Sequence, residues 1–301
     1  MSSRFAADHG LTRRMVTVMF LLGLVYVAFV GVVIMLTKNW VLPIVIALGF
    51  ALVQWFLSDK VALWSLGARD VTPEEAPELH GMVDRLCALA DMPKPRVAYS
   101  DSAVPNAFAT GRSQKSSVLV VTRGIIQRLD TEELEGVLSH ELSHVAHRDV
   151  AVMTIASFLG VLAGIVARYG IFMDTRGSRD NNAALVMLGI WVVSIAVYAI
   201  SFLLIRVLSR YRELAADRAG AYLTGKPSAL ASALVKLNNG MNAIPDKDIR
   251  KSEAMNAFAF TPAFKTGGGR KGFTQMFSTH PSTEKRLEQL ARIANDLGKP
   301  F

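Results

Sequence analysis

Four long runs of apolar residues stand out against an otherwise polar sequence of 301 residues. They cover residues 15–37, 40–57, 150–167 and 183–205. Because an α-helix rises 1.5 Å per residue, about 20 residues cross the roughly 30 Å hydrocarbon core of a bilayer. The runs therefore predict four transmembrane helices, although the second and third are also compatible with buried helices of a protein core.

The polar regions carry patterns typical of short helices and strands. Thr72, Pro73 and Glu75 indicate a helix start, because threonine caps, proline suits the first helical position and glutamate closes a capping box. The apolar spacing that follows predicts a helix to about Ala90. Three short segments predict strands at 96–99, 106–110 and 117–121, with a hairpin turn at 111–115.

A second capping box, at Asp130 and Glu133, predicts a helix that continues through residues 147–149 into the third apolar run. The fourth run is likewise expected to continue as a helix as far as Asp217. Further helices are expected at 228–238 and 283–297, with a loop-rich stretch at 239–275 between them.

Composition supports the membrane interpretation and limits the chemistry. The chain is 51% hydrophobic and only 19% charged, with a mean hydropathy of +0.31. Its net charge is +8, but no nucleic-acid recognition motif is present, so an anionic membrane surface is the simpler explanation and no nucleic-acid partner is expected. Cys87 is the only cysteine, so any metal must be bound by histidine and carboxylate side chains.

The positions of lysine and arginine predict the orientation in the membrane. Arg13 and Arg14 precede the first run, the connection 58–149 is basic, and Arg206 opens the segment after the fourth run. Positive segments stay in the cytoplasm, so the N-terminus and both large polar regions are expected there. No small-residue cleavage site precedes Lys38, and the first run is therefore interpreted as an anchor rather than a cleaved signal peptide.

Chemistry is concentrated in the helix predicted after Asp130. His140 and His144 are four residues apart and share one helix face, where both imidazoles can bind a single metal ion. Glu141 lies beside that position, as a general base for a metal-bound water would. Two histidines and one carboxylate, with water in the fourth position, form a hydrolytic zinc site.

The third ligand must come from elsewhere in the chain. Glu213 lies just beyond the fourth apolar run and His144 just before the third, so an antiparallel pair of helices would bring them together. Asp217, one turn further, would be placed to accept a hydrogen bond from a ligand histidine. Spacing alone leaves open that both are ordinary interfacial charges in a run that also contains Arg210 and Arg212.

The order of these features resembles the HtpX membrane zinc proteases, bacterial inner-membrane enzymes related to the CAAX prenyl proteases. The resemblance rests on residues 106–111, 140–144, 209–217 and 279–281 and covers nearly the whole chain. It implies Glu213 as the third zinc ligand, and Asp217 matches the family's acidic residue after that ligand. Residues 239–275 show no pattern that matches the family.

The runs, the motif and the resemblance together predict a mainly α membrane protein with four transmembrane helices and a cytoplasmic α+β zincin-type protease domain with a small β-sheet. The expected parts are a transmembrane hairpin at 1–58, a first catalytic part at 59–149, a second hairpin at 150–205 and a second catalytic part at 206–301. One Zn²⁺ per chain is expected in a multi-pass protein of the bacterial inner membrane, with the active site facing the cytoplasm. The resemblance implies polypeptide substrates, chiefly misfolded or damaged membrane proteins, and control by stress; nothing in the sequence indicates the oligomeric state.

In the expected reaction, Glu141 takes a proton from metal-activated water and passes it to the leaving amine. His280 and Arg210 are the candidates for stabilising the oxyanion, although His280, which precedes a proline and a capped helix, is also compatible with a structural role. Substrate is expected to bind as an added strand beside residues 106–110, where Asn106 is a candidate contact.

Two other functions compete with the endopeptidase hypothesis. One is a membrane scaffold that keeps a structural metal site, but such a site needs no base at position 141. The other is a prenyl-peptide protease, whose family has more membrane spans and a large enclosed chamber, for which four spans leave too little chain.

Overall fold

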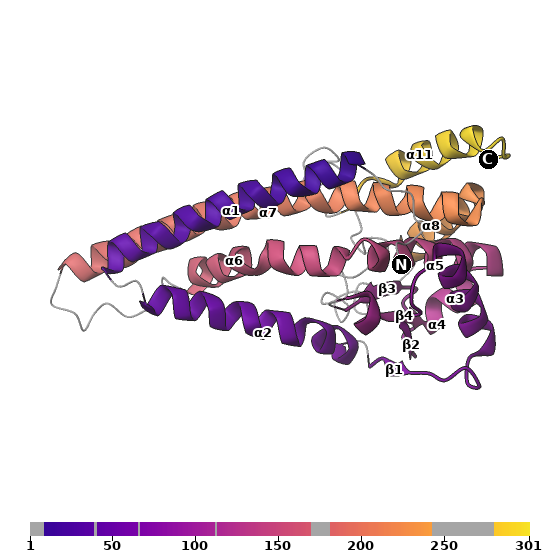
Figure 1. Cartoon of the computed structure of the whole chain (residues 1–301), viewed down its shortest axis with the longest axis horizontal. Helices are drawn as coiled ribbons and strands as arrows, with labels where there is room; N and C mark the ends of the chain where they lie inside the picture. Colours follow the sequence, from indigo (N-terminus) through magenta and orange to yellow (C-terminus); the bar gives the residue numbers. More distant parts are fainter. Residues whose placement is uncertain (1–8, 39–40, 66, 112, 170–180, 243–279) are drawn as a thin grey trace. The chain divides into compact units, whose positions relative to one another are not determined.

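The computed structural model describes residues 9–38, 41–65, 67–111, 113–169, 181–242 and 280–301. The chain divides into two compact units. The apolar unit comprises His9–Leu57 and Val152–Leu208, and the described residues of the polar unit lie within Ser58–Ala151 and Ser209–Phe301. The protein is mainly helical, and the described residues include one small mixed sheet (Figure 1).

Four helices contribute to the apolar unit: α1 (His9–Thr37), α2 (Val41–Ser65), α6 (Asp149–Tyr169) and α7 (Asn181–Thr224). Their core includes Leu22 of α1, Ala163 of α6 and Val197 of α7. Many large apolar side chains remain exposed, as a surface in contact with lipid would require. Among the described helices, α1 and α7 contain stretches long and apolar enough to cross a membrane, Thr12–Leu36 and Leu185–Thr224. The apolar stretches of α2 and α6, Ile44–Val53 and Val152–Val166, are shorter.

Helices α6 and α7 approach each other closely at two glycines of α6. A Cβ atom added at Gly160 would lie 3.0 Å from Cβ of Ser201, and one added at Gly164 would lie 2.9 Å from the ring of Tyr198. Glycines four residues apart share a helix face, and such faces let helices pack closely in membranes.

The sheet of the polar unit has the strand order β1-β2-β4-β3. The strands are β1 (Arg69–Asp70), β2 (Arg96–Ser100), β3 (Ala107–Thr110) and β4 (Val118–Thr122). β2 and β4 are parallel, whereas β3 pairs antiparallel with β4 and lies at the edge of the sheet. The antiparallel pairing of β3 and β4 confirms the hairpin predicted there; its connection includes a short 3₁₀ helix, Gln114–Ser116.

The helices of the polar unit are α3 (Pro77–Ala90), α4 (Arg123–Arg128), α5 (Thr131–Ala146), α8 (Pro227–Asn242) and α11 (Thr283–Asp296). The predicted capping box of α5 is confirmed, because Asp130 accepts from the Glu133 N–H and Glu133 accepts from the Asp130 N–H. Glu133 is buried and also binds Ser232 and Lys236 of α8, so one side chain starts α5 and fastens α8 to it.

The predicted start of the first polar helix is wrong. Residues 73–75 form a turn, and α3 begins at Pro77 rather than at Pro73. Proline at position 77 would clash with the preceding turn of a helix begun at 73 and cannot donate to it, so the helix starts where proline is tolerated. Glu75 still accepts from the Thr72 N–H, which keeps half of the predicted capping box as a turn.

The predicted continuity of α5 into the third apolar run is also wrong. α5 ends at Ala146, α6 begins at Asp149, and Arg148 between them has a φ of 56°. By contrast, α7 runs unbroken from the fourth apolar run past Asp217, as predicted. Of the stretch 239–275, the residues from 243 onward lie outside the described residues.

We expect Glu133→Ala to lower the free energy of unfolding by about 1–3 kcal/mol, because it removes half of a capping box, the acceptor of Ser232 and the nearer of the two carboxylates beside Lys236. Thermal unfolding of the detergent-solubilised protein measures the change. The neighbouring Glu132→Ala removes only an exposed ion pair with Lys226 and should cost less than about 1 kcal/mol. Equal losses in the two variants would contradict the role assigned to Glu133.

Candidate metal centre

Helices α5 and α7 bring the three predicted metal ligands together inside the polar unit. The Nε2 atoms of His140 and His144 lie 3.2 Å apart. Glu213 of α7 places one carboxylate oxygen 3.7 Å from Nε2 of His140 and the other 3.5 Å from Nε2 of His144. These three residues form the metal cluster found among the described residues, and all three are buried.

The close approach of the two helices depends on Gly220 of α7. A Cβ atom added there would lie 2.8 Å from the Ser139 hydroxyl and 3.1 Å from the backbone nitrogen of His140. Because a backbone nitrogen cannot move aside as a side chain can, a larger residue at position 220 would push α7 away from the ligand-bearing turn of α5.

The donor set fits a divalent metal ion. Zinc bound to two imidazole nitrogens at about 2.0–2.1 Å in a tetrahedral arrangement separates those nitrogens by about 3.3 Å, close to the spacing here. Oε2 of Glu213 is buried and makes no hydrogen bond in the described structure, which leaves it available as a ligand.

The buried charges around the ligands also favour a dication. Four carboxylates, of Glu141, Asp149, Glu213 and Asp217, are buried together with two guanidinium groups, of Arg212 and Arg286. With neutral histidines these six groups carry a net charge of −2. Burying uncompensated charge is costly, and a divalent cation balances it.

Each ligand histidine is held by a carboxylate on its far side. Nδ1 of His140 lies 2.9 Å from Asp217, which in turn binds Arg286 of α11 at 2.6 Å. Nδ1 of His144 lies 2.7 Å from Asp149, the first residue of α6. If each Nδ1 carries the proton, both Nε2 lone pairs face Glu213, which is the tautomer that a metal requires.

Sequence reasoning found Asp217 but missed Asp149 and Arg286. Arg286 lies with Leu290, Ile293 and Ala294 on the buried face of α11, so a charge in the apolar stripe of an amphipathic helix was the available signal. Asp149 gave no such signal, because it reaches His144 only through the helix break that the sequence analysis did not predict.

The candidate base Glu141 lies beside the edge strand. Its carboxylate accepts a hydrogen bond of 3.2 Å from the backbone N–H of Ala109 in β3. Burial raises the pKa of Glu141 to about 7, although positive charge on His144 and the bond from Ala109 oppose the rise. A carboxyl group with a pKa near neutrality can both accept and return a proton.

His144 shows how strongly the surrounding carboxylates favour positive charge. Burial by itself would lower the pKa of this histidine, but hydrogen bonds to Asp149 and Glu213 outweigh burial and raise the pKa to about 10. The same negative groups that hold a proton on the ring stabilise a metal cation at its Nε2.

The remaining predicted residues lie at different distances from the cluster. His280 places Nδ1 3.0 Å from Glu213, so the structure brings it to the ligands. Asn106 is buried immediately before β3, and its backbone N–H donates to Thr122. Arg210 is half-buried on α7, whereas Arg286 reaches Glu213, with Nη1 3.8 Å from Oε2.

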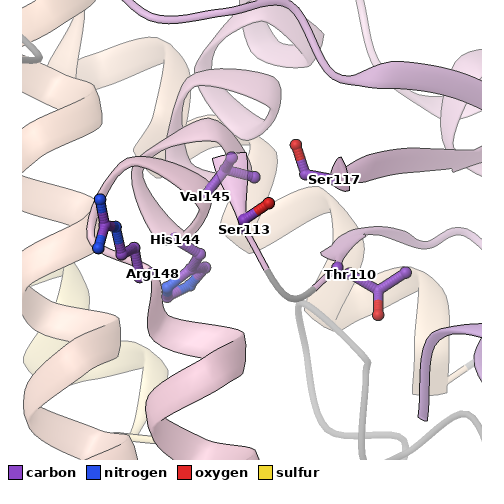
Figure 2. A pocket seen from close by; sticks show the side chains of 7 residues that line it. Thr110, Ser113, Ser117, His144, Val145 and Arg148 are labelled. Atoms are coloured by element: carbon purple, nitrogen blue, oxygen red, sulfur yellow. The ribbon is translucent and has the colours of Figure 1, made fainter. Parts of the chain in front are cut away.

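A small pocket opens next to the cluster, on the side of His144 (Figure 2). It lies between the end of α5 and the connection from β3 to β4. The residues that line it are Thr110, Gly111, Ser113, Ser117, His144, Val145 and Arg148. Its exposed lining is mainly apolar, although three hydroxyl side chains and one guanidinium belong to it.

Most of the chain matches a known protein family in sequence. Residues 73–294 match the sequence profile of peptidase family M48. The chain belongs to peptidase family M48. The matched range includes α5, the polar part of α7 and Arg286, so it contains the whole cluster.

The M48 relatives are similar over their full length. The chain is 57% identical over 301 residues to "Protease HtpX homolog 1" of Streptomyces coelicolor, covering 99% of this chain and 98% of that protein. It is 47% identical over 303 residues to "Protease HtpX homolog 2" of Methanosarcina acetivorans, covering 99% and 100%. The resemblance to HtpX proteases is therefore confirmed.

A solved structure also has a similar fold. The crystal structure of Ste24p from S. mikatae matches with a TM-score of 0.52 and 17% sequence identity. The match covers 89% of this chain, which spans 62% of the length of Ste24p. At this identity the likeness concerns the fold alone.

Gly220→Ala should weaken metal binding of this M48 chain by separating α7 from α5. The added Cβ meets backbone atoms of His140, and overpacking of this kind costs about 1–3 kcal/mol. Zinc content and thermal unfolding of the purified variant measure the effect. Gly81→Ala on α3 is the matched control, because a Cβ there meets nothing within 4 Å, and it should behave as the wild type. Wild-type zinc content and stability in Gly220→Ala would refute the packing argument.

Proposed function

We propose that the chain is a membrane-anchored zinc endopeptidase. The observation that carries the proposal is the His140–His144–Glu213 cluster with Glu141 bound to the edge strand beside it. A metal site with a base and an adjacent strand edge has the parts needed to bind and cut an extended peptide. Membership of peptidase family M48 supports the same activity.

His140, His144 and Glu213 would hold one Zn²⁺ per chain. When bound, zinc supplies a Lewis acid that lowers the pKa of water to about 7 and polarises a carbonyl group. Asp217 and Asp149 keep the two rings turned toward that position. Glu141 accepts the proton of the attacking water and later delivers it to the leaving amine.

The edge strand β3 is suited to hold the substrate backbone. Asn106 accepts from the Thr122 N–H of β4, whereas the N–H of Ala109 points to Glu141. Ala107 and Ala109 therefore direct their backbone N–H and C=O groups away from β4. An extended peptide paired antiparallel along this edge would pass directly in front of Glu141.

His280 and Arg286 are placed to stabilise negative charge that develops on the substrate carbonyl. Both contact Glu213, so their side-chain nitrogen atoms lie within the cluster rather than at its rim. Arg210, the other sequence candidate, lies half-buried on α7. Asn106 stays a candidate substrate contact at the start of β3.

We further propose that the apolar unit forms two transmembrane hairpins, at 1–58 and 150–205, and that 59–149 and 206–301 form the catalytic domain on the cytoplasmic face of a bacterial inner membrane. The four apolar helices and the exposed apolar surface support this arrangement. Substrates would be polypeptides, chiefly misfolded or damaged membrane proteins. The similarity to "Protease HtpX homolog" proteins supports a role in protein quality control.

Glu141→Gln is the direct test. Purified variant and wild type should each hold about one zinc per chain, while cleavage of casein and of a misfolded membrane protein should fall about 10²–10⁴-fold in the variant. A wild type that binds zinc but cleaves neither substrate would favour a scaffold with a structural metal site. A variant that cleaves at the wild-type rate would rule out the role of Glu141.

The pH dependence tests the link between the base and the edge strand. Glu141 acts as a carboxylate, so kcat/KM should rise with pH through its pKa. In Ala109→Pro the donor to that carboxylate is lost, the pKa of Glu141 should rise further, and the rising limb should move to higher pH with zinc retained. A limb that stays in place, with zinc bound, would contradict the contribution of the Ala109 N–H.

A further inference from the structure

The chain leaves the helical conformation directly after the metal-binding helix. α5 ends at Ala146, and Arg148 adopts a left-handed conformation with φ of 56° before α6 begins at Asp149. This conformation is uncommon for a residue other than glycine, and such residues are concentrated at functional sites. The side chain of Arg148 is exposed, so no burial of that side chain accounts for the backbone conformation.

The break decides where Asp149 lies. In an uninterrupted helix, residue 149 would lie about 7.5 Å further along the axis than His144 and be turned about 140° away from it. Because of the break, Oδ2 of Asp149 lies 2.7 Å from Nδ1 of His144. Asp149 is 2% exposed, so this contact is shielded from water.

Arg212 of α7 fixes the other oxygen of the same carboxylate. Its Nε lies 3.1 Å from Oδ1 of Asp149, and the guanidinium is buried. The two groups are not aligned for a hydrogen bond, so the contact is an ion pair. Arg212 directly precedes Glu213. The ion pair therefore connects Asp149, the partner of His144, to the residue next to Glu213.

The arrangement around His144 repeats the arrangement around His140. Asp217 contacts Nδ1 of His140 and is neutralised by Arg286. Each carboxylate thus has its own guanidinium, and neither pair adds net charge to the centre. A neutral pair can orient an imidazole without reducing the positive charge that a bound metal offers to water and substrate.

We propose that Asp149 and Arg212 are positioning residues of the metal centre. Asp149 accepts a hydrogen bond from Nδ1–H of His144, which fixes the ring with its Nε2 lone pair toward Glu213. Arg212 holds the carboxylate of Asp149 in the place where it can do so. This role rests on the proposed zinc site. The helix break at Arg148 then has the function of bringing Asp149 to Nδ1 of His144.

The test measures zinc affinity of the full-length protein in detergent by competition with a chromophoric chelator. Asp149→Ala should weaken zinc binding about 10–100-fold, and Arg212→Gln should weaken it toward the lower end of that range. Asp149→Glu, which keeps the carboxylate, should recover part of the loss. Asp70→Ala is the matched control, because it removes an exposed aspartate that pairs with Arg96 in the same unit, and its affinity should equal that of the wild type.

A spectroscopic measurement separates positioning from a general effect on the fold. In Co²⁺-substituted protein, the visible absorption bands should change in Asp149→Ala and Arg212→Gln but not in the control, because these bands report ligand geometry. Wild-type zinc affinity and wild-type cobalt spectra in both variants, whatever their thermal stability, would overturn the inference. If Asp149→Ala does not fold, Arg212→Gln decides the question alone. A wild type without stoichiometric zinc would instead refute the proposed function.

Discussion

The metal centre depends first on how closely α7 approaches α5. Gly220 allows this approach, because any side chain there would collide with Ser139 and with the backbone of His140. The contact sets the distance from Glu213 to both histidines, and these two helices supply every residue of the cluster. Close packing at one glycine thus becomes a requirement for ligand geometry, since packed interiors cannot absorb an extra atom without moving the backbone.

Electrostatics imposes a second requirement on the same region. The carboxylates proposed to bind and orient the metal would repel one another without partners, and the structure pairs two of them with buried arginines. The remaining two, on Glu141 and Glu213, are left to face the position of the cation. The burial that raises the pKa of Glu141 also excludes water, which strengthens the interactions of a bound metal with its ligands.

Local patterns allowed much of the site to be predicted. The spacing of His140 and His144, the capping box at Asp130 and the continuation of α7 to Asp217 each depend on residues within a few turns of one another. Glu213 could be proposed from spacing but needed the family resemblance to be preferred over an ordinary interfacial charge. The strands were predicted nearly at their observed positions, except for the two-residue β1.

What could not be predicted depends on contacts between distant residues or on unusual backbone. Arg148 takes a left-handed conformation that nothing in its residue type favours, so the break and the contact from Asp149 to His144 were missed. Arg286 comes 69 residues after its partner Asp217, a separation over which periodicity carries no information. Pro77 is different, since its effect on the helix start is local and could have been recognised.

The central requirement of the proposed site is a metal ion held between α5 and α7. X-ray absorption at the zinc edge of the purified wild-type protein measures the ligands directly. It should show two imidazole nitrogens and carboxylate or water oxygens at about 2.0–2.2 Å, and Glu213→Ala should lose the protein oxygen or the metal itself. A zinc ion with a different number of imidazoles, or with ligands unchanged in Glu213→Ala, would contradict the account.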